Sequence, residues 1–178
     1  MGEIKSAVEL AMERTKGLRL SQEEKEKIKE EEIQSRAAGW VNRYLEVDFH
    51  LREIEKELAR FDPAQRQHLE KLFIQNLAGA MSLDRENDLI LQGLETFLPA
   101  SAGTVKKIRD LIQKYKNKRK EEFQRTESAL SAKLARLGIS GSAVLPRVEG
   151  SPEWEEALAK FKPGFEEDLK GLKKGILV

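Results

Sequence analysis

Residues 33–61 have the sequence IQSRAAGWVNRYLEVDFHLREIEKELARF, in which apolar side chains recur at alternating spacings of four and three. This spacing places them on one stripe of an α-helix, because two helical turns take about seven residues. The stripe consists of Ile33, Ala37, Trp40, Tyr44, Val47, Leu51, Ile54, Leu58 and Phe61. Burial of one large apolar side chain contributes about 1.5–3 kcal/mol. We therefore expect the stripe to be covered, either by the chain's own core or by an interface with a second copy or another protein.

Capping residues mark both ends of this expected helix. Ser21 followed by Glu24 is a capping box, so a helix should begin directly after Ser21. Asp62 and Pro63 supply an N-cap and a first-turn proline for the next helix, so the first one should end before them. One continuous helix over residues 22–61 would be about 60 Å long at 1.5 Å per residue.

Two shorter and more apolar helices are expected after this long one. The first begins after Asp62 and carries Leu69, Leu72, Phe73, Leu77 and Met81. The second begins at Ser82 or Asp84 and ends before Pro99. Because these two helices are the most apolar of the chain, we expect them to form its compact core.

A second long helix is expected over residues 104–137, after the caps that Ser101 and Thr104 offer. It would be about 51 Å long. Since its length is close to that of the helix over residues 22–61, the two are expected to lie side by side as an antiparallel hairpin. The short helices would then form a knob at one end. The alternative is that each apolar stripe pairs with its own copy in a dimer.

The C-terminal part differs in composition from the preceding chain. Residues 138–150 are rich in Gly and Ser and indicate an extended connector. Ser151 and Pro152 then mark a helix start, and Pro163 and Gly164 are expected to divide the remainder into two short helices. We therefore expect a helical body over residues 1–137, opening with a short amphipathic helix, and an appendage over residues 138–178.

Composition supports an all-α fold: an elongated helical bundle or long antiparallel hairpin with short capping helices and a C-terminal appendage. About half of the 178 residues are Ala, Leu, Glu, Lys or Arg, which is typical of long helices and argues against an all-β protein. A net charge of +1 gives the whole molecule no electrostatic match to nucleic acid or to an anionic membrane. The chain has no cysteine and no apolar segment long enough to span a membrane, so a cytoplasmic location is expected.

One local stretch is strongly basic and suggests an alternative partner. Over residues 105–120 the cationic side chains are Lys106, Lys107, Arg109, Lys114, Lys116, Lys118, Arg119 and Lys120, with Asp110 as the only acid. Such a run can follow a phosphate backbone, and Tyr115 within it can stack on a base. It can equally lie against the acidic sequence QEEKEKIKEEE at residues 22–32. The sequence leaves both possibilities open.

No arrangement of residues typical of catalysis or of cofactor binding is found. The two histidines, His50 and His68, lack the Glu three positions earlier that a di-metal helical bundle requires. Neither histidine has a nucleophile that the spacing identifies. We expect no metal and no cofactor, and an enzyme or small-ligand protein is the third hypothesis.

Two segments carry a resemblance to a known group of proteins. The opening GEIKSAVELAMERTK, and ISGSAVLP followed by SPEWEEAL, resemble segments of an uncharacterised bacterial family of small all-helical proteins. The resemblance implies a bacterial cytoplasmic protein and assigns no activity to any residue. The function expected first is that of a non-catalytic helical interaction or scaffold protein that associates with itself, as a dimer, or with another protein. A nucleic-acid-binding module that uses residues 105–120 is the second.

Overall fold

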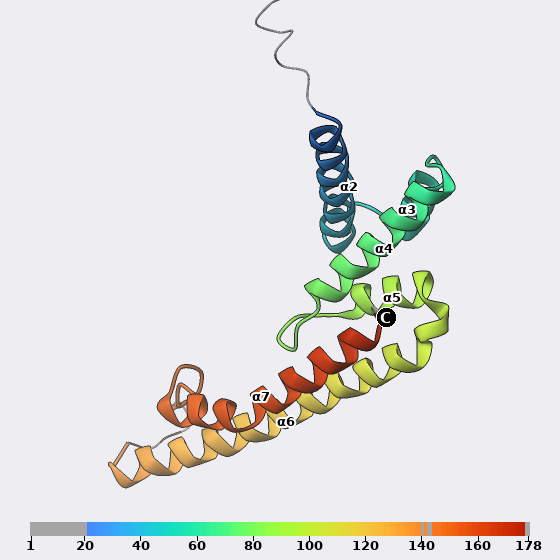
Figure 1. The fold of residues 1–178 in the computed structure, drawn as a ribbon. Helices are drawn as coiled ribbons and strands as arrows, with labels where there is room; N and C mark the ends of the chain where they lie inside the picture. The colour runs from blue at the N-terminus through green and yellow to red at the C-terminus, as the bar shows by residue number, and fades with distance from the viewer. Residues whose placement is uncertain (1–20, 140, 142–143, 177–178) are drawn as a thin grey trace, which may run out of the picture.

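The computed structural model describes residues 21–139, 141 and 144–176 of the chain. These residues form six α-helices and one short 3-10 helix, and none of them lies in a strand, so the all-α prediction is confirmed (Figure 1). The helix expected near the N-terminus, at residues 2–16, lies outside the described residues. The elements are α2 (Gln22–Leu45), α3 (Leu51–Leu58), α4 (Pro63–Ala80), α5 (Asp88–Phe97), η1 (Pro99–Ser101), α6 (Ala102–Arg136) and α7 (Pro152–Ile176).

The prediction of one helix over residues 22–61 is wrong, because a turn at residues 46–50 separates α2 from α3. Val47 adopts a φ of 65° there, which costs an L-residue about 1–2 kcal/mol. The same turn places Phe49 in the core at 7% exposure, with the Arg43 guanidinium 4.3 Å from the centre of its ring. Burying a Phe side chain contributes about 1.5–3 kcal/mol, which offsets the strain at Val47. The apolar spacing alone does not reveal this exchange.

Helix α4 begins as the sequence predicts, whereas α5 begins later than expected. Asp62 caps α4 by accepting hydrogen bonds from the backbone N–H groups of residues 64 and 65 at 3.1 and 3.0 Å. Residues 81–87 form a loop rather than the first turn of α5. The buried Asn87 side chain holds this loop: its Nδ2 donates to the carbonyls of Ser82 and Arg85 at 2.7 Å each. These bonds give the carbonyls of Ser82 and Arg85 hydrogen-bond partners without a helical turn.

The predicted pairing of the helices expected over residues 22–61 and 104–137 is also wrong. Helix α6 pairs with α7 in an antiparallel hairpin, and α2 packs mainly against α4 (Figure 1). The reason is that α2 ends at Leu45, while α7 is a single 25-residue helix that is long enough to cover much of α6. The basic face of α6 therefore does not lie along the acidic start of α2.

Helix α7 continues through Pro163, where two separate helices were predicted. A proline inside a helix costs about 3 kcal/mol or more, because it removes one hydrogen bond and clashes with the preceding turn. Phe161 and Phe165, on either side of it, both pack on Tyr115, with ring centres 6.0 and 5.5 Å away. Leu169, one turn further on, is buried as well. Burial of these side chains together exceeds the cost of the proline.

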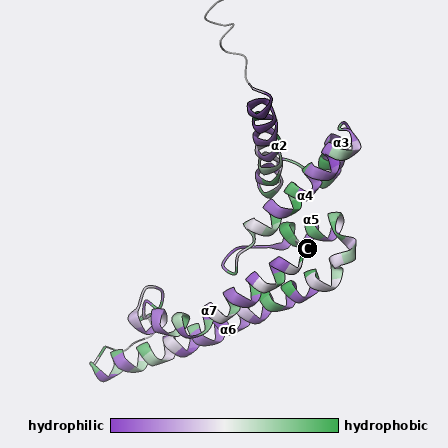
Figure 2. Ribbon diagram, in the orientation of Figure 1, coloured by the Kyte–Doolittle hydropathy of each residue, from purple (hydrophilic) through white to green (hydrophobic). Residues whose placement is uncertain are grey.

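The molecule consists of a head and an arm. We call α2 to α5 the head and α6 with α7 the arm, which extends away from the head in Figure 1. The head and the near half of the arm share one hydrophobic core, to which α7 contributes Leu169 and Ile176. In the far half of the arm the buried side chains are Thr126, Val148 and Trp154. Figure 2 shows that the first half of α2, at the other end of the molecule, is strongly hydrophilic.

Candidate interaction surfaces

The apolar stripe of residues 33–61 lies mostly inside the chain. Five of its members are buried in the core: Ala37, Trp40, Tyr44, Ile54 and Leu58. Ile33, Leu51 and Phe61 are half-buried against the same core. Val47 is 62% exposed, because it lies in the turn between α2 and α3.

Contacts from α4 and α5 cover the stripe. The ring of Trp40 packs edge-on against that of Phe61, and Tyr44 packs on Phe73 of α4, each pair with centres 6.4 Å apart. The Tyr44 hydroxyl donates to the carbonyl of Leu89 at 2.8 Å, and burial raises the pKa of Tyr44. The chain's own helices thus occupy the face that the stripe presents.

The eight basic residues over positions 105–120 are spread around α6, and half of them are paired with acids of the same chain. Arg109 contacts Glu95 of α5 at 2.8 Å, and Lys116 contacts Glu86 of the loop before α5 at 3.0 Å. Lys118 pairs with Glu122 at 2.9 Å, and Arg119 pairs with Glu149 at 3.8 Å. The hydrogen bond from Lys118 lowers the pKa of Glu122.

The remaining basic residues are exposed and make no ion pair with any residue that the structure describes. They are Lys106, Lys107, Lys114 and Lys120. Asp110 lies among them on the same solvent-facing side of α6. The stretch thus presents four unpaired cations, with Asp110 among them, rather than eight. Tyr115, which the sequence offered as a stacking residue, is 1% exposed and is not available to a base.

A cluster that sequence reasoning missed joins the head to the arm. Asp84, in the loop before α5, accepts a hydrogen bond from the Tyr115 hydroxyl at 2.7 Å and one from the Lys162 ammonium at 2.6 Å. Burial alone raises the pKa of Asp84, but the bonds from Lys162 and Tyr115 outweigh it and lower that pKa below its usual range. Burial, followed by the bond to Asp84, raises the pKa of Tyr115. The three residues come from three segments, and no local sequence signal links them.

A second link ties α7 to the end of α4. The Lys173 ammonium donates to the Met81 carbonyl at 2.5 Å and lies 3.5 Å from the carbonyl of Gly79. A cation near the last carbonyls of a helix interacts favourably with the helix dipole. Burial lowers the pKa of Lys173. Both links serve the junction of head and arm and leave the arm's far end free.

The far end of the arm carries an exposed apolar surface. We call residues 130–148, at the end of α6 and in the connection to α7, the arm tip. Leu137, Ile139 and Leu145 of the arm tip are 70%, 49% and 82% exposed. They are three of the five large apolar side chains that are exposed in the described chain. Arg136 and Arg147 flank them and make no ion pair with a described residue.

The opposite end of the molecule carries an exposed acidic surface. Residues 22–29, at the beginning of α2, are all exposed. Residues 22–32 contain six Glu and three Lys. Ile28, at 41% exposure, is the one apolar residue of this part of α2. Glu30 is held by His68 of α4 at 3.0 Å, and this bond lowers the pKa of Glu30. We call residues 22–32 the α2 start.

Neither histidine belongs to a metal site in the part of the chain that the structure describes. The described residues contain no group of three or more His, Asp or Glu side chains placed to hold a metal ion. His50 is exposed at the start of α3, where its backbone N–H donates to Glu53 at 2.8 Å.

Comparison with known proteins identifies no relative of this chain. No protein-family model, no curated protein and no solved structure matches it. Among the described helices, none combines the length and the apolar character that crossing a membrane requires.

Proposed function

We propose that the protein is a non-catalytic, self-associating helical scaffold protein, in which the arm tip of one copy docks on the α2 start of a second copy. The observation that carries this proposal is the concentration of exposed apolar side chains at the arm tip. Large exposed apolar patches mark interaction sites more often than they occur without a role. At the arm tip Leu137 and Leu145 are exposed by 70% and 82%, and no described residue covers them.

Charge complementarity selects the α2 start as the occupant of this surface. The arm tip contains Lys133, Arg136 and Arg147 and no acidic residue. Since Glu153 already binds Lys133 at 3.0 Å, the two arginines are the charges that remain for a partner. The α2 start has a net negative charge and presents Ile28 among its glutamates. Opposite charges around an apolar contact steer association and fix its register.

The shape of the molecule allows both contacts to form at once. The α2 start and the arm tip lie at opposite ends of the structure (Figure 1). Two copies side by side in antiparallel orientation, related by a two-fold axis, would each place an arm tip on the other's α2 start. Such a closed dimer forms the apolar contact twice but loses the translational freedom of one copy only once. A single contact of three side chains would hardly offset that loss.

Analytical ultracentrifugation of the full chain at a series of concentrations tests the proposal. We expect a monomer–dimer equilibrium with a dissociation constant on the order of micromolar, typical of a modest interface. Leu137→Asp combined with Leu145→Asp should weaken the dimer by about 100-fold or more, since two apolar contacts are lost. Val47→Asp is the matched control, because Val47 is 62% exposed but lies in the turn between α2 and α3.

Charge reversal separates self-association from binding to another protein. Arg136→Glu with Arg147→Glu should weaken the dimer, and so should Glu31→Lys with Glu32→Lys. A mixture of the two double variants should dimerise again, because each pairs its altered surface with the other's. A wild-type chain that stays monomeric at all concentrations, or that instead binds anionic lipid vesicles through the arm tip, would overturn the proposal.

Nucleic-acid binding by α6 is the second candidate, and the four unpaired lysines are the observation in its favour. It predicts binding of single-stranded RNA or DNA that falls steeply with salt, because each phosphate contact releases counterions. Lys106→Gln with Lys114→Gln should reduce the slope of log affinity against log salt concentration by the amount expected for about two phosphate contacts. Fluorescence anisotropy with a labelled oligonucleotide at 50 and 200 mM salt measures this, and salt-independent binding would reject it.

A further inference from the structure

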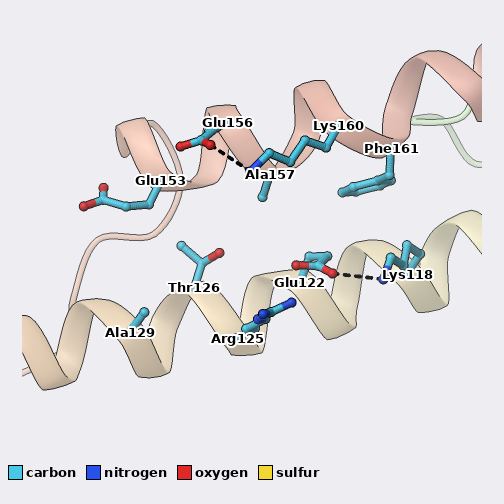
Figure 3. A pocket seen from close by; sticks show the side chains of 10 residues that line it. All are labelled: Lys118, Glu122, Arg125, Thr126, Ala129, Glu153, Glu156, Ala157, Lys160 and Phe161. Atoms are coloured by element: carbon cyan, nitrogen blue, oxygen red, sulfur yellow. Dashed lines mark hydrogen bonds and ion pairs between the residues drawn. The ribbon is translucent and has the colours of Figure 1, made fainter.

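A groove lies between α6 and α7 in the far half of the arm (Figure 3). Its volume is about 360 Å³, which is within the range of small-molecule sites. The groove floor consists of Thr126 and Ala129 from α6 and Ala157 from α7, with the ring of Phe161 at one end (Figure 3). The charged side chains along its rim are Lys118, Glu122, Arg125, Glu153, Glu156 and Lys160.

The groove exists because large side chains space the two helices and only small ones lie between them on this side. Phe123 and Trp154 pack edge to face across the helix pair, with ring centres 5.5 Å apart. Phe161 packs on Tyr115 nearer the head. A floor of one threonine and two alanines cannot fill the space that these aromatic pairs open. The groove is thus a product of the α6–α7 packing and needs no movement to form.

Thr126 presents an unused polar group to this groove. Its side chain is 7% exposed and rises from α6 into the space between the helices (Figure 3). Thr96 and Ser128 direct their hydroxyls back to the carbonyl four residues earlier, each at 2.9 Å. The Thr126 hydroxyl makes no hydrogen bond to a described residue, either in this way or with another side chain. No fully buried side-chain polar atom of the described residues lacks a hydrogen-bond partner, so the Thr126 hydroxyl reaches the solvent of the groove, where it is free to donate to a ligand.

Arg125 is the rim charge that remains without a partner. Lys118 binds Glu122 at 2.9 Å, Lys160 binds Glu156 at 2.7 Å, and Lys133 binds Glu153 at 3.0 Å, so each acid of the rim is neutralised by a lysine. Arg125 makes no ion pair with a described residue. Lys133 lies outside the groove lining, and when it is counted with the three bases and three acids of the rim one cation is left over. That cation is the Arg125 guanidinium, whose planar donors match a carboxylate.

From these features we infer that the groove binds a small monocarboxylate with an unbranched apolar chain. The guanidinium of Arg125 and the hydroxyl of Thr126 would donate to the carboxylate. The apolar chain would lie on Ala129 and Ala157 and end at the ring of Phe161. This site is independent of the proposed dimer contact, which uses the arm tip and the α2 start.

Titration with octanoate, followed by nuclear magnetic resonance of the backbone amides, tests this site on the full chain. Octanol and octylamine serve as ligand controls, because they carry the same chain with a neutral or a cationic head. We expect octanoate to shift the amide signals of Arg125, Thr126, Ala129 and Ala157 in a saturable manner. Octanol should bind at least about 10-fold more weakly, which corresponds to the loss of one charge-assisted hydrogen bond.

Variants of this chain then identify the groups responsible. Arg125→Gln should weaken octanoate about 10-fold or more and leave octanol unchanged, because only the charged contact is lost. Thr126→Val, which keeps the volume of the side chain, should weaken octanoate about 5-fold. Ala157→Phe should abolish binding by filling the groove. Ala159→Phe, on the exposed side of the same helix, is its matched control.

Two results would overturn the inference. Equal binding of octanoate, octanol and octylamine would show that no carboxylate is recognised. An octanoate affinity that is unchanged in both Ala157→Phe and Thr126→Val would place the ligand elsewhere. Thr126→Val keeps the test valid if the bulkier variant fails to fold, and far-ultraviolet circular dichroism establishes folding for each variant.

Discussion

The head and the far half of the arm bury their side chains in different ways. In the head, helices from several directions enclose fully buried residues such as Phe73, Leu77 and Leu94. Beyond the middle of α6 only two helices remain, so each leaves most of its surface to solvent. A pair of helices can hold a groove and an exposed apolar end that a multi-helix core would close. This difference explains why the groove and the arm tip both lie on the arm.

The largest expected effect on the free energy of unfolding comes from truncating one apolar side chain in each region. Phe73→Ala should lower the free energy of unfolding by about 3–5 kcal/mol, because a fully buried ring is replaced by a cavity. Leu134→Ala, at a half-buried position in the far arm, should cost about 1 kcal/mol. Urea denaturation followed by circular dichroism measures both. Equal losses would mean that the far arm is as tightly packed as the head.

Two glycine substitutions, one in the head and one in the arm, are expected to have smaller effects on stability and of opposite sign. In the head, a Cβ added at Gly93 would meet the Leu77 side chain at 2.8 Å and that of Tyr44 at 3.4 Å. Gly93→Ala should therefore destabilise the protein by about 1–3 kcal/mol through overpacking. On the arm, nothing lies within 4 Å of a Cβ at Gly171 in α7, so Gly171→Ala should stabilise by about 0.5–1 kcal/mol. Thermal melts of the two variants should shift in opposite directions.

The smallest expected effect concerns the junction between the two regions and depends on pH. Because Lys162 and Tyr115 lower the pKa of Asp84 in the folded state, Asp84 contributes stability above its unfolded pKa and loses it as pH falls through the folded value. Asp84→Asn should cost about 0.5–1 kcal/mol at pH 7, discounted for partial exposure. This difference should begin to fall as pH drops through the ordinary pKa of an aspartate, about 4, and should vanish only below the lowered pKa of folded Asp84. A difference that stays constant from pH 7 to pH 3 would contradict the assignment.

Local signals in the sequence predicted the starts of α2, α4 and α7 but not the helix partners. The caps at Ser21 and Asp62 and the proline at residue 152 lie where α2, α4 and α7 begin, because capping depends on neighbours within one turn. The turn at Val47 escaped prediction because the apolar spacing runs through it without interruption. Pro163 was misleading for the opposite reason, since distant aromatic contacts outweigh a strong local helix breaker.

The surfaces were predicted less well than the helices. Residues 138–150 were expected to be a connector, and nothing in their composition indicates that Leu145 faces solvent. Asp84 contacts residues 31 and 78 positions away in the chain, so no spacing rule identifies it. The groove depends on which small residues of α6 and α7 face one another, which is fixed only once the two helices are known to pair.

The bond from Lys173 to the end of α4 has a consequence for the order of events during synthesis. The carbonyls of Gly79 and Met81 are translated more than ninety residues before the ammonium that they bind. Since chains emerge from the ribosome N-terminus first, α4 must wait without this cap until residue 173 has been translated. The junction between head and arm is therefore finished last, and a nascent chain that stops short of residue 173 lacks it.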